Sequence, residues 1–206
     1  MSYTELLLPE VLPAAPGCLD EVARRAIRAA AMEFFRDSTA WRHTTEGSAV
    51  IEGAREVELS LPRGTFIHRV FWARIGDRDL KGISERWASD DSRGIPREYS
   101  VPSGGRQLLL NPIPQKGEFV PGLIAHVALV PGFDSTDIPR NLLEKYRMGL
   151  VYGAIRNVLA TPGAAWSDIR LAGEYGMMFE TEKAHALRAS NADNAPIVRK
   201  VRYGGL

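Results

Sequence analysis

The chain has 206 residues, of which 45% are hydrophobic and 25% are charged, a composition that indicates a soluble globular protein and excludes a disordered or fibrous one. The 26 Lys and Arg residues nearly balance the 25 Asp and Glu residues, so the chain lacks the basic excess that dominates nucleic-acid binding. No apolar run approaches the ~20 residues of a membrane span, and we therefore expect no membrane partner. Cys18 is the only cysteine, which fits a reducing compartment and excludes an internal disulfide.

The first strong pattern is helical and begins at Asp20. From this point apolar residues recur at intervals of three and four, which predicts an amphipathic helix with one buried face that ends near Trp41. Asp20 is positioned to cap the free amides at the start of this helix. The apolar residues of the predicted buried face are Val22, Ala23, Ala26, Ile27, Ala30, Phe34 and Phe35.

Beyond His43 the pattern changes to the alternation and the short apolar runs that are typical of β-strands. Glycine and proline separate these runs and supply the turns between them. Together the runs predict an antiparallel sheet or a small sandwich. The predicted strands are residues 56–61, 66–75, 99–101, 107–110 and 123–130, and a short helical turn over residues 83–90 carries Trp87 inward.

Helical spacing returns after Asp137, which is a reasonable cap for a helix with Pro139 in its first turn. Gly149 and Gly153 lie within this helix, where each costs ~1 kcal/mol relative to alanine. Close approach of another helix would compensate for that cost, so we expect a neighbouring helix at these two positions. The predicted buried face of this helix is Leu142, Leu143, Tyr146, Leu150, Ala154 and Val158.

A last helix follows the break Thr161-Pro162-Gly163. Ser167 is positioned to cap this helix, and the helical pattern fades near Asn191. The early helix needs a partner for its apolar face, and the two late helices are its natural partners. We therefore predict that one N-terminal and two C-terminal helices form a bundle.

The order of these parts predicts an α+β protein with a helical bundle, an inserted antiparallel β-sheet or sandwich, and an extended C-terminal tail. Residues 1–46 and 134–190 would form the helical bundle domain, and residues 47–133 the inserted β domain. Residues 191–206 would form a docking tail.

A search for reactive groups predicts no catalytic, cofactor-binding or metal-ligating residues. Phosphate-binding, zinc-protease, hydrolase and dinucleotide-binding motifs do not occur in the sequence, and the four histidines are scattered. Two alternatives stay open. One is a small metal-dependent hydrolase or nuclease that uses Asp90, Asp91 and His126, and the other is a tail-associated module that binds a host glycan through Trp72 or Trp87.

The end of the chain combines strand-forming residues with cations, a pattern that favours docking in a cleft or strand addition to a partner sheet. Ordering such a tail costs ~1 to 2 kcal/mol per residue, about what burial of its apolar side chains gains. Many tails presented together bind through their effective concentration, so the segment makes most sense in an oligomer. The predicted docking residues are Ile197, Val198, Arg199, Lys200, Val201, Arg202 and Tyr203.

Three stretches of the chain resemble the head-to-tail connector, or adaptor, proteins of tailed bacteriophages. The first is the opening Leu7-Leu8-Pro9-Glu10-Val11-Leu12 with Pro16-Gly17-Cys18 and the Ala- and Arg-rich helix that follows. The second is Leu142-Leu143-Glu144-Lys145-Tyr146, and the third is the Leu159-Ala160-Thr161-Pro162-Gly163 break that leads to Trp166-Ser167-Asp168. The order of parts matches over nearly the whole chain.

This resemblance implies a non-enzymatic virion protein of the head–tail junction, assembled in the host cytoplasm. Proteins of that family form a ring with copies of themselves, often a dodecamer, beneath the portal. The implied partners are the portal protein, which residues 197–203 would grip, and the next tail component, a nozzle or tail terminator, which residues 49–130 would meet. Viral DNA would pass through the ring without sequence-specific binding, and a near-neutral net charge fits a channel in which DNA slides.

Overall fold

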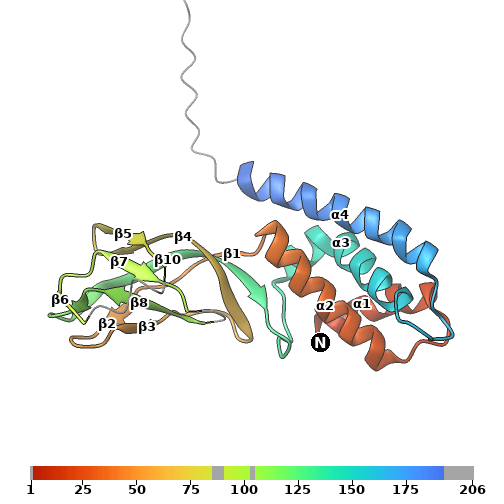
Figure 1. Ribbon diagram of the computed structural model, residues 1–206, viewed down its shortest axis with the longest axis horizontal. Coiled ribbons are helices and arrows are strands. Elements are labelled where there is room, and N and C mark those ends of the chain that lie inside the picture. The colour runs from red at the N-terminus through yellow and green to blue at the C-terminus, as the bar shows by residue number, and fades with distance from the viewer. Residues whose placement is uncertain (1, 85–90, 103–104, 193–206) are drawn as a thin grey trace, which may run out of the picture.

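The computed structural model describes residues 2–84, 91–102 and 105–192. The protein has an α+β fold in which the helices gather at one end and a curled, mixed β-sheet lies at the other (Figure 1). The described residues form four α-helices, α1 (Tyr3–Val11), α2 (Asp20–Ser38), α3 (Arg140–Leu159) and α4 (Ile169–Ala192), and a short 3-10 helix η1 (Leu12–Ala14).

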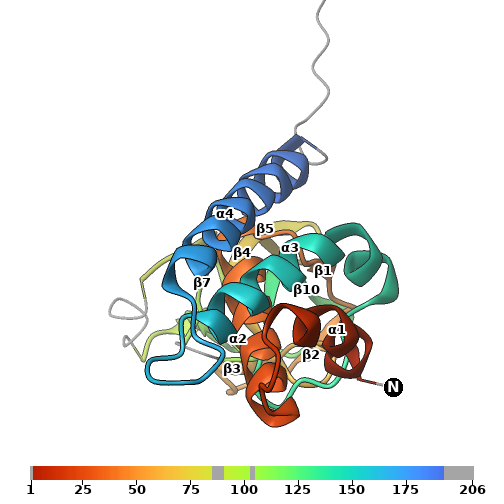
Figure 2. The same ribbon diagram turned by 90° about the vertical axis from the view of Figure 1, so that its right-hand side faces the viewer.

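The three predicted helices pack on one another as expected. Helix α3 lies between α4 on one side and the pair α1 and α2 on the other (Figure 2). The side chains of Ile27, Phe34 and Phe35 in α2 are fully buried, as is Phe179 in α4. The rings of Phe34 and Phe179 contact each other, with centroids 6.1 Å apart. Aromatic packing therefore joins α2 to α4.

Gly149 and Gly153 of α3 are the points of closest approach, as predicted from their cost in a helix. A Cβ atom on Gly149 would lie 2.6 Å from Cε2 of Phe34, and one on Gly153 would lie 2.6 Å from Cε2 of Phe179. Such distances are well inside van der Waals contact, so only glycine lets the two rings rest against the α3 backbone.

The helix ends differ from the predicted caps in three places. Helix α2 begins after Leu19 without a side-chain cap and ends at Ser38, before Trp41. Pro139, and not Asp137, is the N-cap of α3. At α4 the Oδ1 atom of Asp168 accepts a hydrogen bond from the amide of Leu171, while the Ser167 hydroxyl donates to the carbonyl of Leu159. A side chain caps a helix only where the backbone before the helix places a side-chain oxygen within hydrogen-bond distance of the free amides. The position of a residue in the sequence does not by itself determine that placement.

Helix α1 was not predicted. The side chain of Ser2 accepts a hydrogen bond from the amide of Thr4 at its start, and Leu7 and Val11 are buried. Pro9 lies inside this helix, where it removes one backbone hydrogen bond. The short length and the proline hide the helical period, and contacts with α2 and α3 stabilise the helix instead.

The sheet has eight strands in the order β1-β10-β4-β5-β7-β8-β3, with β2 also paired to β10, and a separate two-stranded sheet joins β6 to β9. The predicted strands 66–75 and 123–130 are present within β4 and β10, whereas the strand predicted to reach residue 61 ends at Glu58. Residues 85–90, which include Trp87, lie outside the described residues. The strands are β1 (Arg42–Thr44), β2 (Ser48–Val50), β3 (Glu56–Glu58), β4 (Thr65–Ile75), β5 (Arg78–Gly82), β6 (Arg93–Gly94), β7 (Glu98–Ser100), β8 (Gln107–Asn111), β9 (Ile113–Pro114) and β10 (Glu118–Pro131).

The prediction of a purely antiparallel sheet or sandwich was wrong. Strand β5 pairs with β7 in parallel, and β6 pairs with β9 in parallel, so the sheet is mixed and curls on itself. A parallel pair needs a crossover connection rather than a hairpin turn, and β6 lies between β5 and β7 in the sequence. Strand β5 was not among the predicted strands.

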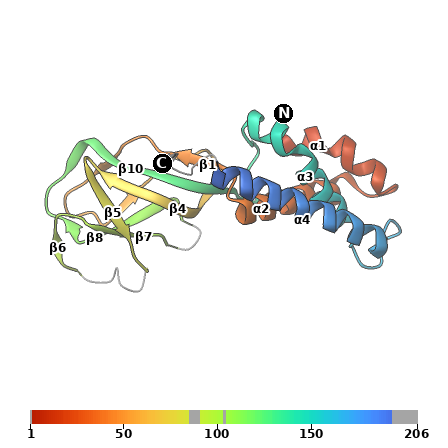
Figure 3. The same cartoon turned by 90° about the horizontal axis from the view of Figure 1, so that it is seen from above.

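The core is one cluster of buried side chains that includes residues of the helices and of the inner face of the sheet. The end of α4 lies beside the sheet, next to β1 and β4 (Figure 3), and Nη2 of Arg42 in β1 donates to Oδ1 of Asn191 at 3.4 Å. The division into bundle domain, β domain and tail stays a prediction.

Candidate interaction surfaces

The outer face of β1, β10 and β4 is basic and aromatic. The register pairs Trp72 with His126 and Arg69 with Ala128, and it shifts by one residue between His126 and Val127. This shift is a β-bulge that leaves Phe71 unpaired. The bulge changes the alternation of the strand, so Arg69 and Trp72 share the outer face although they are three residues apart.

Guanidinium groups lie over the rings of this face. The Cζ atom of Arg42 is 4.2 Å from the centroid of the Phe71 ring, and that of Arg69 is 5.5 Å from it. The Cζ atom of Arg74 lies 4.8 Å from the Trp72 centroid. Stacking on a ring holds a guanidinium in place, and a stacked guanidinium can still donate to carboxylate or phosphate oxygens. Arg42 already donates to the carbonyl of Thr39 and to Asn191. We call the residues Arg42, Arg69, Phe71, Trp72 and Arg74 the basic face.

His126 supports the rings of the basic face from β10. Its ring is stacked with that of Trp72, with centroids 5.9 Å apart and an interplanar angle of 16°, and lies 5.4 Å from the Phe71 centroid. Its Nδ1 atom is 2.8 Å from Oγ1 of Thr44, and its Nε2 atom is buried without a hydrogen-bond partner in the described part of the chain. Burial, with the nearby charge of Arg42 and then His43, lowers the pKa of His126.

The three residues of the hydrolase alternative are not brought together. Asp90 lies outside the described residues. Asp91 is exposed, and its Oδ1 atom pairs with Nη2 of Arg55 at 3.2 Å. Among residues 2–84, 91–102 and 105–192, His126 has no carboxylate partner, because its contacts are with Thr44 and two aromatic rings. The geometry therefore supports packing, not acid–base chemistry, for His126.

An acidic edge lies on β3, where Glu56 and Glu58 are exposed on either side of the buried Val57. The pairing of Glu56 with Leu109 and of Glu58 with Gln107 places both carboxylates on the outer face of the sheet. In the described part of the chain neither carboxylate has a cationic partner. We call Glu56 and Glu58 the acidic edge.

Helix α4 exposes several large apolar side chains. Met177 is 68% exposed and Met178 is 47% exposed, although the next residue, Phe179, is fully buried. Ile169 and Leu187 are exposed along the same helix. Flexible, polarisable methionine side chains are common at surfaces that bind other proteins, so the surface around Met177 and Met178 is a candidate contact surface.

Beneath that surface, ionic contacts join α4 to α2 and α3. The Nζ atom of Lys183 lies 3.0 Å from Oε1 of Glu33 and 2.9 Å from Oδ2 of Asp37, and Arg156 also pairs with Glu33 at 2.6 Å. Burial disfavours the charged ammonium, but hydrogen bonds to Glu180, Asp37 and Glu33 outweigh it and raise the pKa of Lys183. The hydrogen bond from Arg156 is the largest influence on Glu33 and lowers the pKa of its carboxyl. These contacts are structural, because partners surround each charge.

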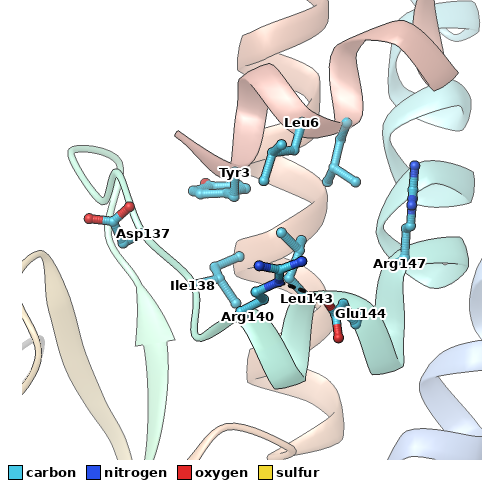
Figure 4. Close-up of a pocket in the computed structure, with 9 residues that line it drawn as sticks. Tyr3, Leu6, Asp137, Ile138, Arg140, Leu143, Glu144 and Arg147 are labelled. Atoms are coloured by element: carbon cyan, nitrogen blue, oxygen red, sulfur yellow. Dashed lines mark hydrogen bonds and ion pairs between the residues drawn. The ribbon is translucent and has the colours of Figure 1, made fainter. Parts of the chain in front are cut away.

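A cavity of about 480 Å³ lies between α1 and the start of α3. Figure 4 shows Tyr3 and Leu6 of α1 on one side of the cavity, with Ile138 and Arg140, in the first turn of α3, across from them. Of the charged lining residues, Arg140 pairs with Glu144, with 2.7 Å between Nε and Oε1, and Arg147 pairs with Glu10. The lining therefore combines apolar side chains with charged ones. The lining residues are Tyr3, Leu6, Leu7, Asp137, Ile138, Arg140, Leu143, Glu144 and Arg147.

No group of three or more His, Cys, Asp and Glu side chains in the described residues could hold a metal ion. None of the helices in this part of the chain has the length and apolar character needed to cross a membrane. The predicted docking residues 197–203 lie outside the described residues. The sequence analysis missed the basic face and the acidic edge, because both depend on strand register. The one sequence signal was the run Arg69-Val70-Phe71-Trp72, which breaks the strict alternation of a strand.

The comparisons with known proteins do not assign the chain to a family. No protein-family model matches the sequence. No curated protein matches it significantly.

Proposed function

We propose that this chain is a structural protein of a phage virion that forms a homo-oligomeric ring between the portal and the tail. The observation that carries the proposal is the set of large apolar side chains exposed on α4, above all Ile169, Met177 and Met178. Met177 and Met178 are neighbours in the chain and both exposed, and burial of such side chains against a partner would be favourable. The resemblance in the order of parts, with two late helices separated by the break at Thr161-Pro162-Gly163, makes the connector ring the specific candidate.

We also propose that the protein is not an enzyme and that DNA passes through its ring. Asp91 pairs with Arg55, and His126 packs against Phe71 and Trp72, so the two described residues of the hydrolase alternative already have structural partners. The formal net charge is only +1, which supports a channel that does not retain DNA by charge. The site of action would be the head–tail junction of the virion, after assembly in the host cytoplasm.

The C-terminal tail is the proposed attachment to the portal. Helix α4 ends at Ala192, so removal of residues 193–206 leaves every helix and strand described above intact. We expect this truncated protein to keep the thermal stability of the full chain and to lose binding to the portal. Unchanged attachment would contradict the docking role of residues 197–203 and would direct attention to the helices.

The test of the ring uses the purified chain mixed with the portal protein from the same genome. Negative-stain electron microscopy and native mass spectrometry should show a closed ring of this chain, of about twelve copies by the resemblance, on the portal. Absence of any ring on the portal would refute the proposal. A glycan array with the full chain and with Trp72→Ala separates the remaining alternative, because binding that depends on Trp72 would indicate a host-glycan module.

A further inference from the structure

We propose that neighbouring copies of this chain contact one another head to tail, with the basic face of one copy against the acidic edge of the next. The inference rests on the proposed ring and names the surfaces that would join its subunits. Arg69 and Arg74, which stand on either side of Trp72, are the cations of this contact, and Glu56 and Glu58 are its anions.

Both surfaces carry charge that the described part of the chain does not neutralise. Arg69 is exposed and lies over the ring of Phe71, but no carboxylate pairs with it in residues 2–84, 91–102 and 105–192. Glu56 and Glu58 are exposed and, in the same residues, have no cation beside them. Arg74 has only the exposed Asp79, with 3.4 Å between Nε and Oδ1. Each surface therefore fits a partner of opposite charge.

The two surfaces lie on different sides of the sheet. Strand β5 and the end of β4 that pairs with it lie on the upper side of the sheet, and β3 lies along its lower side (Figure 1, Figure 2). Between β4 and β3 the sheet order places β5, β7 and β8. Opposite charges on opposite sides favour a contact in which each copy uses one surface toward one neighbour and the other surface toward the next. Such a heterologous contact builds rings when its rotation closes.

A symmetric two-fold contact is disfavoured by the same charges. Because the two surfaces lie on different sides of the sheet, a two-fold contact centred on either one would place the basic face against a second basic face, or one acidic edge against another, and like charges at an interface repel. The guanidinium groups are already held over Phe71 and Trp72, so little side-chain freedom is lost when carboxylates arrive. The contact is exposed to solvent, and salt should therefore weaken it.

Charge exchange within one chain tests the contact. Arg69→Glu and Glu58→Arg should each reduce ring formation on the portal at least tenfold, and the double variant should restore it, because every interface then holds the reversed pair. Arg25→Glu is the matched control, since it makes the same change of charge on the exposed side of α2. Ring formation is counted by mass photometry at low and high salt, and thermal unfolding confirms that each variant is folded.

The outcomes separate this inference from the proposed function. If the unaltered chain forms no ring, the proposed function fails. If the unaltered chain forms rings and Arg69→Glu forms them equally well, or if the double variant is no better than the single variants, the head-to-tail contact is refuted and the ring stands.

A crosslinking experiment addresses the same contact without charge reversal. Glu58→Cys and Arg69→Cys are combined in a Cys18→Ala background, and the portal-bound protein is oxidised. Head-to-tail contacts should give a ladder of linked copies on a non-reducing gel, whereas each single cysteine should give only monomers. Dimers from a single cysteine would indicate a symmetric contact and would overturn the inference.

Discussion

Replacement of Gly153 by alanine tests the packing at the centre of the helical bundle. The added Cβ atom would lie 2.6, 2.8 and 2.9 Å from the Cε2, Cδ2 and Cζ atoms of Phe179. Phe179 is fully buried, with Phe34 against it, so the ring cannot swing into solvent. We expect Gly153→Ala to lower the free energy of unfolding.

The magnitude follows from two opposed effects. Alanine gains about 1 kcal/mol over glycine in a helix interior, and overpacking of a filled core costs about 1–3 kcal/mol. Gly173 in α4 supplies the matched control, because a Cβ atom there has no neighbouring heavy atom within 4 Å. Gly173→Ala should therefore stabilise the protein, and the difference between the two variants should equal the packing cost, about 2 kcal/mol.

The measurement is urea unfolding followed by circular dichroism, supported by thermal unfolding. A difference of about 2 kcal/mol corresponds to a separation of about 4–8 °C in Tm for a chain of this size. Phe179→Leu combined with Gly153→Ala should recover part of the loss, as a positive coupling in a double-mutant cycle. A Gly153→Ala protein as stable as Gly173→Ala would refute the idea that Phe179 rests on the α3 backbone.

Two further predictions concern acid stability and the α4 surface. The pKa of Glu33 is held below its ordinary 4.5, so its stabilising contribution is complete above that pH and is lost as the pH falls through the lower, folded-state value. Glu33→Gln should lower the free energy of unfolding by about 1–3 kcal/mol at pH 7, since Lys183 and Arg156 lose a charged partner. In urea-unfolding experiments below pH 4.5, the free energy of unfolding of this variant should fall less steeply with decreasing pH than that of the unaltered protein. An unchanged pH dependence would contradict this prediction. Met177→Ser should change the free energy of unfolding by less than about 0.5 kcal/mol, because the side chain is 68% exposed. The same variant should form fewer rings on the portal. Full ring assembly by this variant would show that this part of α4 is not in the contact between subunits.

The helices that could be predicted are those in which the apolar spacing of three and four continues over many residues. The regular spacing in α2 and the pair Gly149 and Gly153 in α3 were sufficient to predict a bundle and its closest contact. Helix α1 escaped detection because it is short and contains Pro9, so its stability depends on neighbours that are remote in sequence. The caps of α2 and α4 also differed from prediction, since the direction of the preceding turn decides which oxygen faces the free amides.

Over the long periodic stretches, the sequence by itself determined which segments of this chain are helix or strand. The spacing of apolar residues, about 3.6 residues in a helix and 2 in a strand, identifies the side of each segment that is buried. Only the tertiary structure decided the strand order, the parallel pairing of β5 with β7, and the bulge at Phe71 that turns Arg69 and Trp72 to one face. Pairing between strands depends on which edges meet when the sheet curls, and that choice is made by contacts between residues far apart in the chain. The charges of Arg69, Glu56 and Glu58 are visible in the sequence, but their separation onto two sides of one sheet is a property of the fold.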